Sequence, residues 1–158
     1  MKPDECLLLL ARVLDAASVA LPEKSALFFS GRSVLVMAKA YESDGLTFFA
    51  SDDQVNALAS GWYGFGWFHF GIADGLLKST VPAGCPFSSP CDPLPLRFRD
   101  RLNEKSGRYK NLLDIARHAV RSAPEAGTSA GEFADRVLLI VSVYAGSGNR
   151  CHATGAHE

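Results

Sequence analysis

Seven residues between positions 41 and 74 carry polar or aromatic side chains of the kind that line a small-molecule or peptide pocket. Asp44 and His69 are the titratable pair of such a pocket. The alternative, which we favour, is that the tyrosines and the tryptophan anchor a core while the aspartate and the histidine stand at its wet margin. The candidate pocket residues are Tyr41, Asp44, Asn56, Tyr63, Trp67, His69 and Asp74.

Cysteines and histidines could supply the thiolate and imidazole ligands that Zn²⁺ prefers. Five residues separate Cys85 from Cys91, which is wider than the roughly two to four of most zinc loops. The other ligands would be Cys151, His152 and His157 near the C-terminus. We therefore expect no metal and no cofactor. A disulfide between Cys85 and Cys91 is a further alternative, although reduced thiols are the default for a chain with this cysteine content.

Two other chemical patterns fail on spacing. The run of Gly, Ser, Gly and Asn after Ala145 resembles a phosphate-binding turn, which needs a helix beyond it, and only nine residues follow. Small helical ribonucleases of the HEPN class need an arginine four to six residues before a histidine, to hold phosphate while the histidine transfers a proton. No arginine precedes His69 or His118 at that distance. The sequence therefore favours a protein that is not an enzyme.

Positive charge is concentrated between residues 97 and 121, which contain eight Lys or Arg but only three Asp or Glu. The net charge of the whole chain is −1. On a helix, four of these cations fall in one narrow arc, which would suit an RNA or DNA backbone. Three carboxylates border the arc, so we favour a solvated face. The candidate anion-binding residues are Arg99, Lys110, Arg117 and Arg121.

The apolar spacing predicts that these residues stand on an all-α, up-and-down antiparallel bundle of four to five helices. A first amphipathic helix is expected over residues 3–19. A long helical hairpin follows, with one helix over 22–50 that has Pro22 in its first turn, and one over 51–78 that Ser51 caps. Because the reversal between them is short, the two helices must run antiparallel and in contact.

The second helix of that hairpin carries a stripe of small residues. Glycine in a helix costs about 1 kcal/mol relative to alanine, and five glycines lie between 61 and 75. We expect close approach of the facing helix to offset this cost, since Gly31, Ala38 and Gly45 form a matching seam seven residues apart. The stripe comprises Ala57, Gly61, Gly64, Phe68, Gly71 and Gly75.

The rest of the chain is expected to extend the same domain. Five prolines make residues 79–96 a connector, a fourth helix runs to about Ser122, and a last one, capped by Ser129, ends at Ala145. We expect a single domain over 1–145 and a flexible tail over 146–158.

Composition limits the class of protein. A chain of 158 residues with 47% hydrophobic content can bury one core. Its longest apolar stretch, residues 61–77, is interrupted by His69 and Asp74, so a membrane span is not expected. The acids Asp4 and Glu5 do not suit a secretory signal, and we expect a cytoplasmic protein.

Part of the hairpin resembles a known family. Residues 37–45 read Met-Ala-Lys-Ala-Tyr-Glu-Ser-Asp-Gly, residues 55–59 read Val-Asn-Ala-Leu-Ala, and residues 63–67 read Tyr-Gly-Phe-Gly-Trp. Over about residues 32–77 this resembles DUF357, an archaeal family of unknown function, although His69 replaces an acid expected after the tryptophan.

The resemblance implies an archaeal helical bundle and carries no activity. From the size of the glycine and aromatic face we expect an interaction or scaffolding module that self-associates, with a homodimer favoured. Nucleic-acid binding through residues 97–121, or a small ligand held between the hairpin helices, is the alternative.

Overall fold

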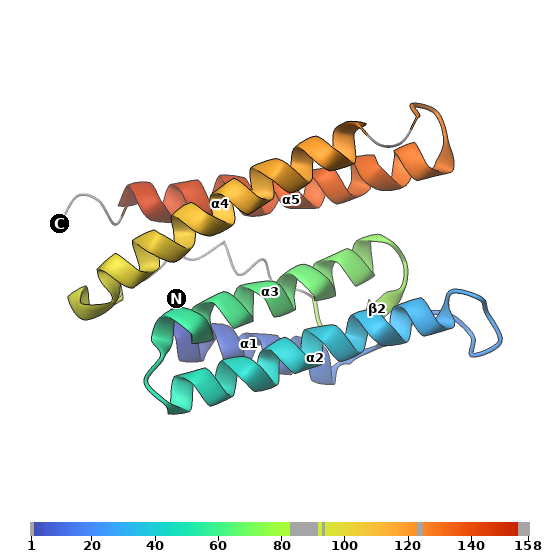
Figure 1. The fold of residues 1–158 in the computed structure, drawn as a ribbon. Coiled ribbons are helices and arrows are strands. Elements are labelled where there is room, and N and C mark those ends of the chain that lie inside the picture. Colours follow the sequence, from blue (N-terminus) through green and yellow to red (C-terminus); the bar gives the residue numbers. More distant parts are fainter. Residues whose placement is uncertain (1, 83–91, 93, 123–124, 155–158) are drawn as a thin grey trace. The chain divides into compact units, whose positions relative to one another are not determined.

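The computed structural model describes residues 2–82, 92, 94–122 and 125–154, without the side chains of 121–122 and 147–154. The all-α class expected from the sequence is confirmed, with one small two-stranded ladder in addition (Figure 1). The elements are α1 (Pro3–Asp15), β1 (Ala17–Val19), α2 (Phe28–Ala50), α3 (Gln54–Ala73), β2 (Leu77–Ser79), the short 3₁₀ helix η2 (Leu96–Phe98), α4 (Arg99–Ser122) and α5 (Ser129–Thr154).

Packing contacts divide the chain into two compact units, Met1–Leu94 and Pro95–Glu158. The first unit contains α1, α2, α3 and the ladder, and the second contains η2, α4 and α5. We describe each unit by itself. The single bundle domain over residues 1–145 stays a prediction.

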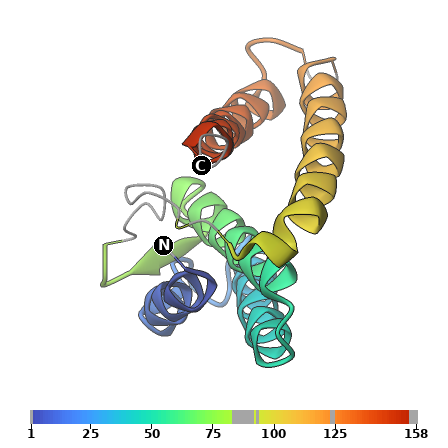
Figure 2. The same ribbon diagram turned by 90° about the vertical axis from the view of Figure 1, so that its left-hand side faces the viewer.

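The shortest helix of the first unit, α1, carries several of the unit's largest fully buried side chains. They follow one another at helical spacing, so that they form a single stripe. Figure 2, which looks more nearly along the helices, shows α1 lying beside the pair made by α2 and α3, and α1 contacts both. Each buried aliphatic side chain contributes about 1.5–3 kcal/mol. The stripe consists of Cys6, Leu7, Leu10, Val13 and Leu14, all 0–1% exposed.

Glycines of the hairpin make room for this stripe. A Cβ on Gly45 would collide with the side chain of Leu7, and a Cβ on Gly64 would collide with that of Leu10. The buried small residues therefore line a groove that receives α1. The expected close contact between α2 and α3 is confirmed as well, since a Cβ on Gly64 would come within 3.3 Å of the Ala38 carbonyl oxygen of α2, and a Cβ on Gly45 within 3.5 Å of the Ala57 carbonyl oxygen of α3. The contact of these glycines with α1 was not expected.

A two-stranded antiparallel ladder joins the chain after α1 to the chain after α3. Ala17 pairs with Ser79, and Val19 pairs with Leu77. A Cβ on Gly31, at the start of α2, would lie 2.9 Å from both the Leu76 carbonyl oxygen and Val19 Cγ1. Helix α2 therefore packs directly against the ladder. The expected helices over 3–19 and 51–78 were therefore too long at their C-terminal ends, where the strands replace them.

Both hairpin helices end in the same hydrogen-bonded motif. At the end of α3, the Leu76 N–H donates to the Gly71 carbonyl at 2.9 Å, and Gly75 has a φ of +69°. This is the Schellman arrangement, in which the residue with positive φ is usually glycine. Gly75 therefore terminates α3 and does not belong to the seam. At the end of α2 the same position is held by Asp52, with a φ of +60°.

The starts of the hairpin helices also differ from the prediction. Helix α2 begins at Phe28, because residues 22–27 form turns in which the Ser25 N–H donates to the Pro22 carbonyl at 2.8 Å. Helix α3 is capped by Asp53, whose Oδ1 accepts from the Asn56 N–H at 3.2 Å. Ser51 is not the cap, since its hydroxyl donates to the Phe48 carbonyl at 3.0 Å.

The second unit is a hairpin of two long helices. Helix α4 ends at Ser122 as expected, and α5 is capped at Thr128, one residue before the expected Ser129, since Thr128 Oγ1 accepts from the Gly131 N–H at 3.1 Å. Helix α5 continues to Thr154, so the expected end at Ala145 is wrong. Most of the proposed connector, residues 83–91 and 93, and the last four residues lie outside the described residues.

Within the described part of the chain, the structure contains no helix with the length and apolar character needed to cross a membrane.

Two glycines of α3 give a matched test of the groove. We expect Gly71→Ala to destabilise the protein by about 1–2 kcal/mol, because its Cβ would lie 2.7 Å from Leu77 Cγ and 2.9 Å from Val34 Cγ1, and overpacking a core costs about 1–3 kcal/mol. Gly66→Ala should stabilise by about 0.5–1 kcal/mol, because its Cβ would meet nothing within 4 Å. Urea unfolding of both variants measures the difference, and equal effects would contradict the packing.

The N-terminal cap of α3 can be tested in the same way. We expect Asp53→Ala to lower the unfolding free energy by about 1 kcal/mol, since it removes the acceptor for the Asn56 N–H. Ser51→Ala should change it by less than about 0.5 kcal/mol. If Ser51→Ala lowers the unfolding free energy more than Asp53→Ala in thermal or urea unfolding, Ser51 is the cap, as expected from the sequence.

Candidate functional site

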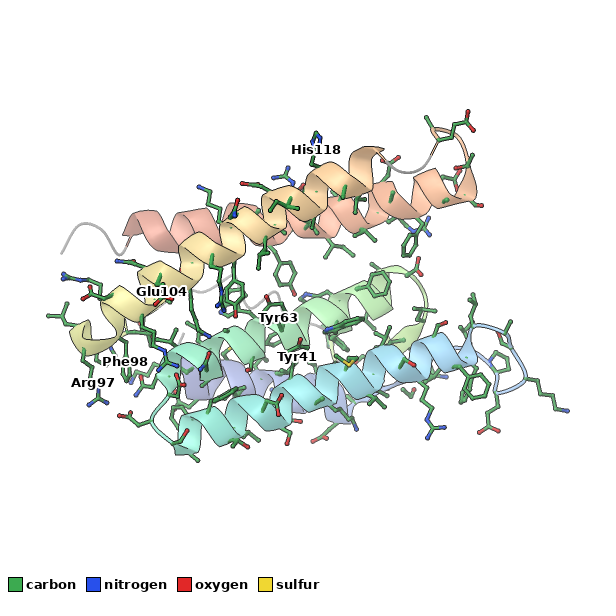
Figure 3. All side chains as sticks on the ribbon, viewed as in Figure 1. Tyr41, Tyr63, Arg97, Phe98, Glu104 and His118 are labelled. Carbon is green, nitrogen blue, oxygen red and sulfur yellow. The ribbon has the colours of Figure 1, made fainter. Side chains whose placement is uncertain are left out.

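Tyrosines from the two hairpin helices meet on the surface of the first unit. The rings of Tyr41 in α2 and Tyr63 in α3 stack with centroids 5.2 Å apart and an interplanar angle of 18° (Figure 3). Tyr41 is half-buried and Tyr63 is 42% exposed. The stack joins α2 to α3 and leaves aromatic surface accessible.

Two more aromatic residues follow Tyr63 along the same side of α3. Trp67 comes four residues after Tyr63, and Phe70 seven residues after it, which places all three on one helical face. The Trp67 and Phe70 rings meet edge to face with centroids 6.5 Å apart. We call Tyr41, Tyr63, Trp67 and Phe70 the aromatic face. Sequence reasoning missed Phe70, which the spacing of three and four residues from Trp67 and Tyr63 could have identified.

Three other candidate pocket residues have separate positions. Asn56 lies at the start of α3, where its Nδ2 donates to Asp53 Oδ2 at 2.6 Å and supports the helix cap. Asp74 is the C-cap residue of α3. Asp44 is exposed, three residues after Tyr41 on α2. These residues border the aromatic face or cap a helix.

His69 lies on another side of α3. It follows Trp67 by two residues, which is about 200° around a helix, so one pocket does not hold both side chains. The His69 ring lies 5.8 Å from that of Phe65 and 5.7 Å from that of Phe68, both of which are fully buried. Burial among these rings lowers the pKa of His69 from its ordinary value of 6.5. His69 thus lies among buried aromatic rings of α3, and Asp44 lies on the exposed side of α2.

The basic residues of the second unit lie on α4 as expected, with acids beside them. Arg99 Nε lies 3.6 Å from Asp100 Oδ1, and Arg117 Nη1 lies 3.9 Å from Asp114 Oδ1. Lys110 is exposed. The side chain of Arg121 lies outside the described residues. The neighbouring carboxylates weaken the positive potential that a phosphate backbone would meet.

Aromatic rings near these cations are already stacked against side chains of their own helix. The Arg97 guanidinium lies 4.7 Å from the Phe98 ring centroid, in η2 just before α4 (Figure 3). Arg108 lies 5.3 Å and Lys105 5.8 Å from the Tyr109 centroid. Binding a nucleobase on these rings would require displacing a cation.

The candidate zinc ligands come from the connector and the C-terminal end of the chain. Cys85, Cys91 and His157 lie outside the described residues, as do the side chains of Cys151 and His152. The described residues contain no cluster of three or more His, Cys, Asp or Glu that could hold a metal ion. Cys6 is a free and fully buried thiol, and burial raises its pKa to about 12, so it fills space in the core.

Residues 7–77 match the family model described as "Protein of unknown function (DUF357)". These residues form a DUF357 domain. The match begins inside α1 and ends at the first residue of β2, so the DUF357 domain includes the buried stripe of α1 from Leu7 onward as well as the hairpin. The resemblance seen in the sequence began at Arg32 and missed α1. No curated protein and no solved structure matches the chain. The archaeal origin that the resemblance implied stays a prediction.

The environment of His69 in the DUF357 domain predicts a pH dependence of stability. Because its pKa is lower in the folded protein than in the unfolded chain, the unfolded chain binds more protons as the pH falls. The contribution of His69 to stability is thus complete above about pH 6.5 and is lost as the pH falls through the lower, folded pKa. We expect His69→Phe, which keeps an aromatic ring, to reduce the loss of stability between pH 7.5 and 5.5. Thermal unfolding at several pH values measures this, and an unchanged pH profile would contradict it.

Proposed function

We propose that the chain works by noncovalent association, with the DUF357 domain as a rigid scaffold that presents the aromatic face to a helix of a partner protein. The observation that carries this proposal is the exposed stack of Tyr41 on Tyr63, extended along α3 by Trp67 and Phe70. Tyrosine and tryptophan are the residues most enriched among those that dominate the energy of protein interfaces. We also propose that the protein is cytoplasmic and forms a homodimer.

The packing beneath the aromatic face supports such a role. Both helices that carry the face are held by α1, whose leucines fill the groove between them on the side lined by Gly45 and Gly64. A surface that is already ordered loses little conformational entropy when it binds. Its two-helix construction suits the i, i+3, i+4 and i+7 spacing of apolar residues on an amphipathic partner helix.

The net charge of the first unit indicates which kind of partner it would bind. Residues 1–94 hold ten Asp or Glu against six Lys or Arg, a net charge of −4. Asp44 stands exposed one turn from Tyr41. We therefore propose a partner helix with an apolar face and basic margins, because opposite charges at the rim favour encounter and orientation. An acidic domain is poorly suited to bind a nucleic acid. If the chain binds nucleic acid instead, the basic helix α4 would have to make the contact.

Selection from a display library of helical peptides tests the proposal. We expect the full-length protein to enrich peptides with an apolar face and flanking Lys or Arg. The combined substitution Tyr41→Ala and Tyr63→Ala should weaken binding of a selected peptide by at least about tenfold, measured by fluorescence anisotropy, since interface aromatics contribute about 2 kcal/mol or more.

The matched control is the pair Ser43→Ala and Thr47→Ala, which alters two exposed residues of α2 outside the aromatic face. It should leave binding unchanged. Failure to enrich any peptide family, or equal binding by the tyrosine variant after its fold is verified by circular dichroism, would reject the proposal. Tight binding of RNA or DNA at low salt that is lost in Arg117→Ala would favour the nucleic-acid alternative.

A further inference from the structure

Helix α2 has an uncharged face on the side turned away from α1 and α3. Its buried residues, which pack against the rest of the first unit, are Gly31, Val34, Ala38 and Gly45. The opposite side carries seven exposed, uncharged residues at alternating spacings of four and three positions. This is the a and d spacing of a coiled coil. We call this face the α2 seam, and it comprises Phe29, Ser33, Val36, Ala40, Ser43, Thr47 and Ala50.

The composition of the α2 seam suits contact with another helix. Phe29 is 68% exposed and Val36 is 57% exposed, so more than half of each apolar residue faces water. The other five positions hold Ser, Ala or Thr, whose small side chains let a facing helix approach closely. The outer face of a surface helix normally carries charged residues, and on α2 these stand to either side of the seam.

Charges of opposite sign flank the α2 seam. Arg32 and Lys39 stand at g positions on one side of it, and Asp44 stands at an e position on the other side. All three side chains are exposed, and none of them forms an ion pair with another of the described residues. Lys39 and Asp44 are separated by about 140° around the helix, so they do not pair within one chain.

These charges distinguish the two orientations in which a second copy of α2 could lie on the seam. In a parallel coiled coil, a g residue meets the e residue of the next heptad in the other helix, so Lys39 of each copy would meet Asp44 of the other. An antiparallel pair would instead set the side with Arg32 and Lys39 against itself, and like charges would repel. The α2 seam is therefore complementary to itself in the parallel orientation, where Phe29 and Val36 each meet their own counterpart.

We propose that the α2 seam is the homodimer interface of this protein, and that two copies of α2 run parallel there about a two-fold axis. This inference rests on the self-association in the proposed function and assigns a surface to it. The glycine and aromatic face was expected to form the dimer, but Gly45 and Gly64 are filled by leucines of the same chain. Tyr41 lies about 120° around α2 from Phe29, so the seam leaves the aromatic face accessible to a partner helix.

The mass of the full-length protein in solution tests the interface, measured by light scattering and by sedimentation over a range of concentrations. We expect a dimer for the unchanged protein. Val36→Glu should raise its dissociation constant at least about thirtyfold, because unpaired carboxylates of the two copies would face each other. Leu8→Glu is the matched control, since Leu8 is a residue of α1 that is 68% exposed and lies outside the seam, and this variant should remain dimeric.

A charge exchange tests the orientation and does not depend on the folding of Val36→Glu. Lys39→Asp alone and Asp44→Lys alone should each weaken the dimer at least about threefold at low salt, because each turns two attractive pairs into repulsive ones. An equimolar mixture of the two variants should form a mixed dimer as stable as the original, since both pairs are then opposite in charge. In an antiparallel dimer, Lys39→Asp would instead strengthen the association.

The outcomes separate this assignment from the proposed function. A stable dimer in Val36→Glu, loss of the dimer in Leu8→Glu, or no mixed dimer between the two charge variants overturns the assignment to the α2 seam while self-association stands. A monomer at every concentration of the unchanged protein overturns both the assignment and self-association. Peptide binding to the aromatic face is measured separately, and its failure would leave the dimer unaffected.

Discussion

The first unit depends on the insertion of α1 leucines into a groove whose walls lack side chains. Leu7 and Leu10 occupy the space that Cβ atoms would take at Gly45 and Gly64, so each glycine is a site of close contact between helices. The helix propensity lost at such positions, about 1 kcal/mol each, is offset by burial of the leucines at about 1.5–3 kcal/mol each. The same insertion holds α2 and α3 side by side, and hence brings Tyr41 against Tyr63.

Much of this fold could be predicted from the sequence, and the failures have identifiable causes. Helical periodicity placed the hairpin, α4 and the buried glycines, because these signals are local and repeat over many residues. The strands escaped notice, since a strand of three residues such as Ala17–Val19 has no pattern of its own and exists only through pairing with residues about sixty positions away. The partner of the glycines was also missed, because a stripe of small residues shows that something approaches closely and does not say what.

The candidate site shows a similar division. Spacing along one helix puts Tyr63 and Trp67 on a common face, and the contact between hairpin helices supplied Tyr41. Adding His69 to that group ignored the 200° that two residues turn on a helix. The histidine lies instead among Phe65 and Phe68, where its ring packs beside aromatic neighbours. Trp67 and His69 are close in sequence, but the helix turns their side chains to different sides. The surface that remains of the candidate site is the aromatic face, with Asp44 beside it.

The ladder between β1 and β2 has a consequence for the order of folding. It ties the residue after α1 to the residues after α3, so the N-terminal helix cannot reach its final position until residue 79 has been synthesised. At about 5–20 residues per second, translation of the sixty-odd intervening residues takes roughly 3–12 s. During that interval the residues that pair with β1 are not yet part of the chain, so the ladder forms only after α3 has been made.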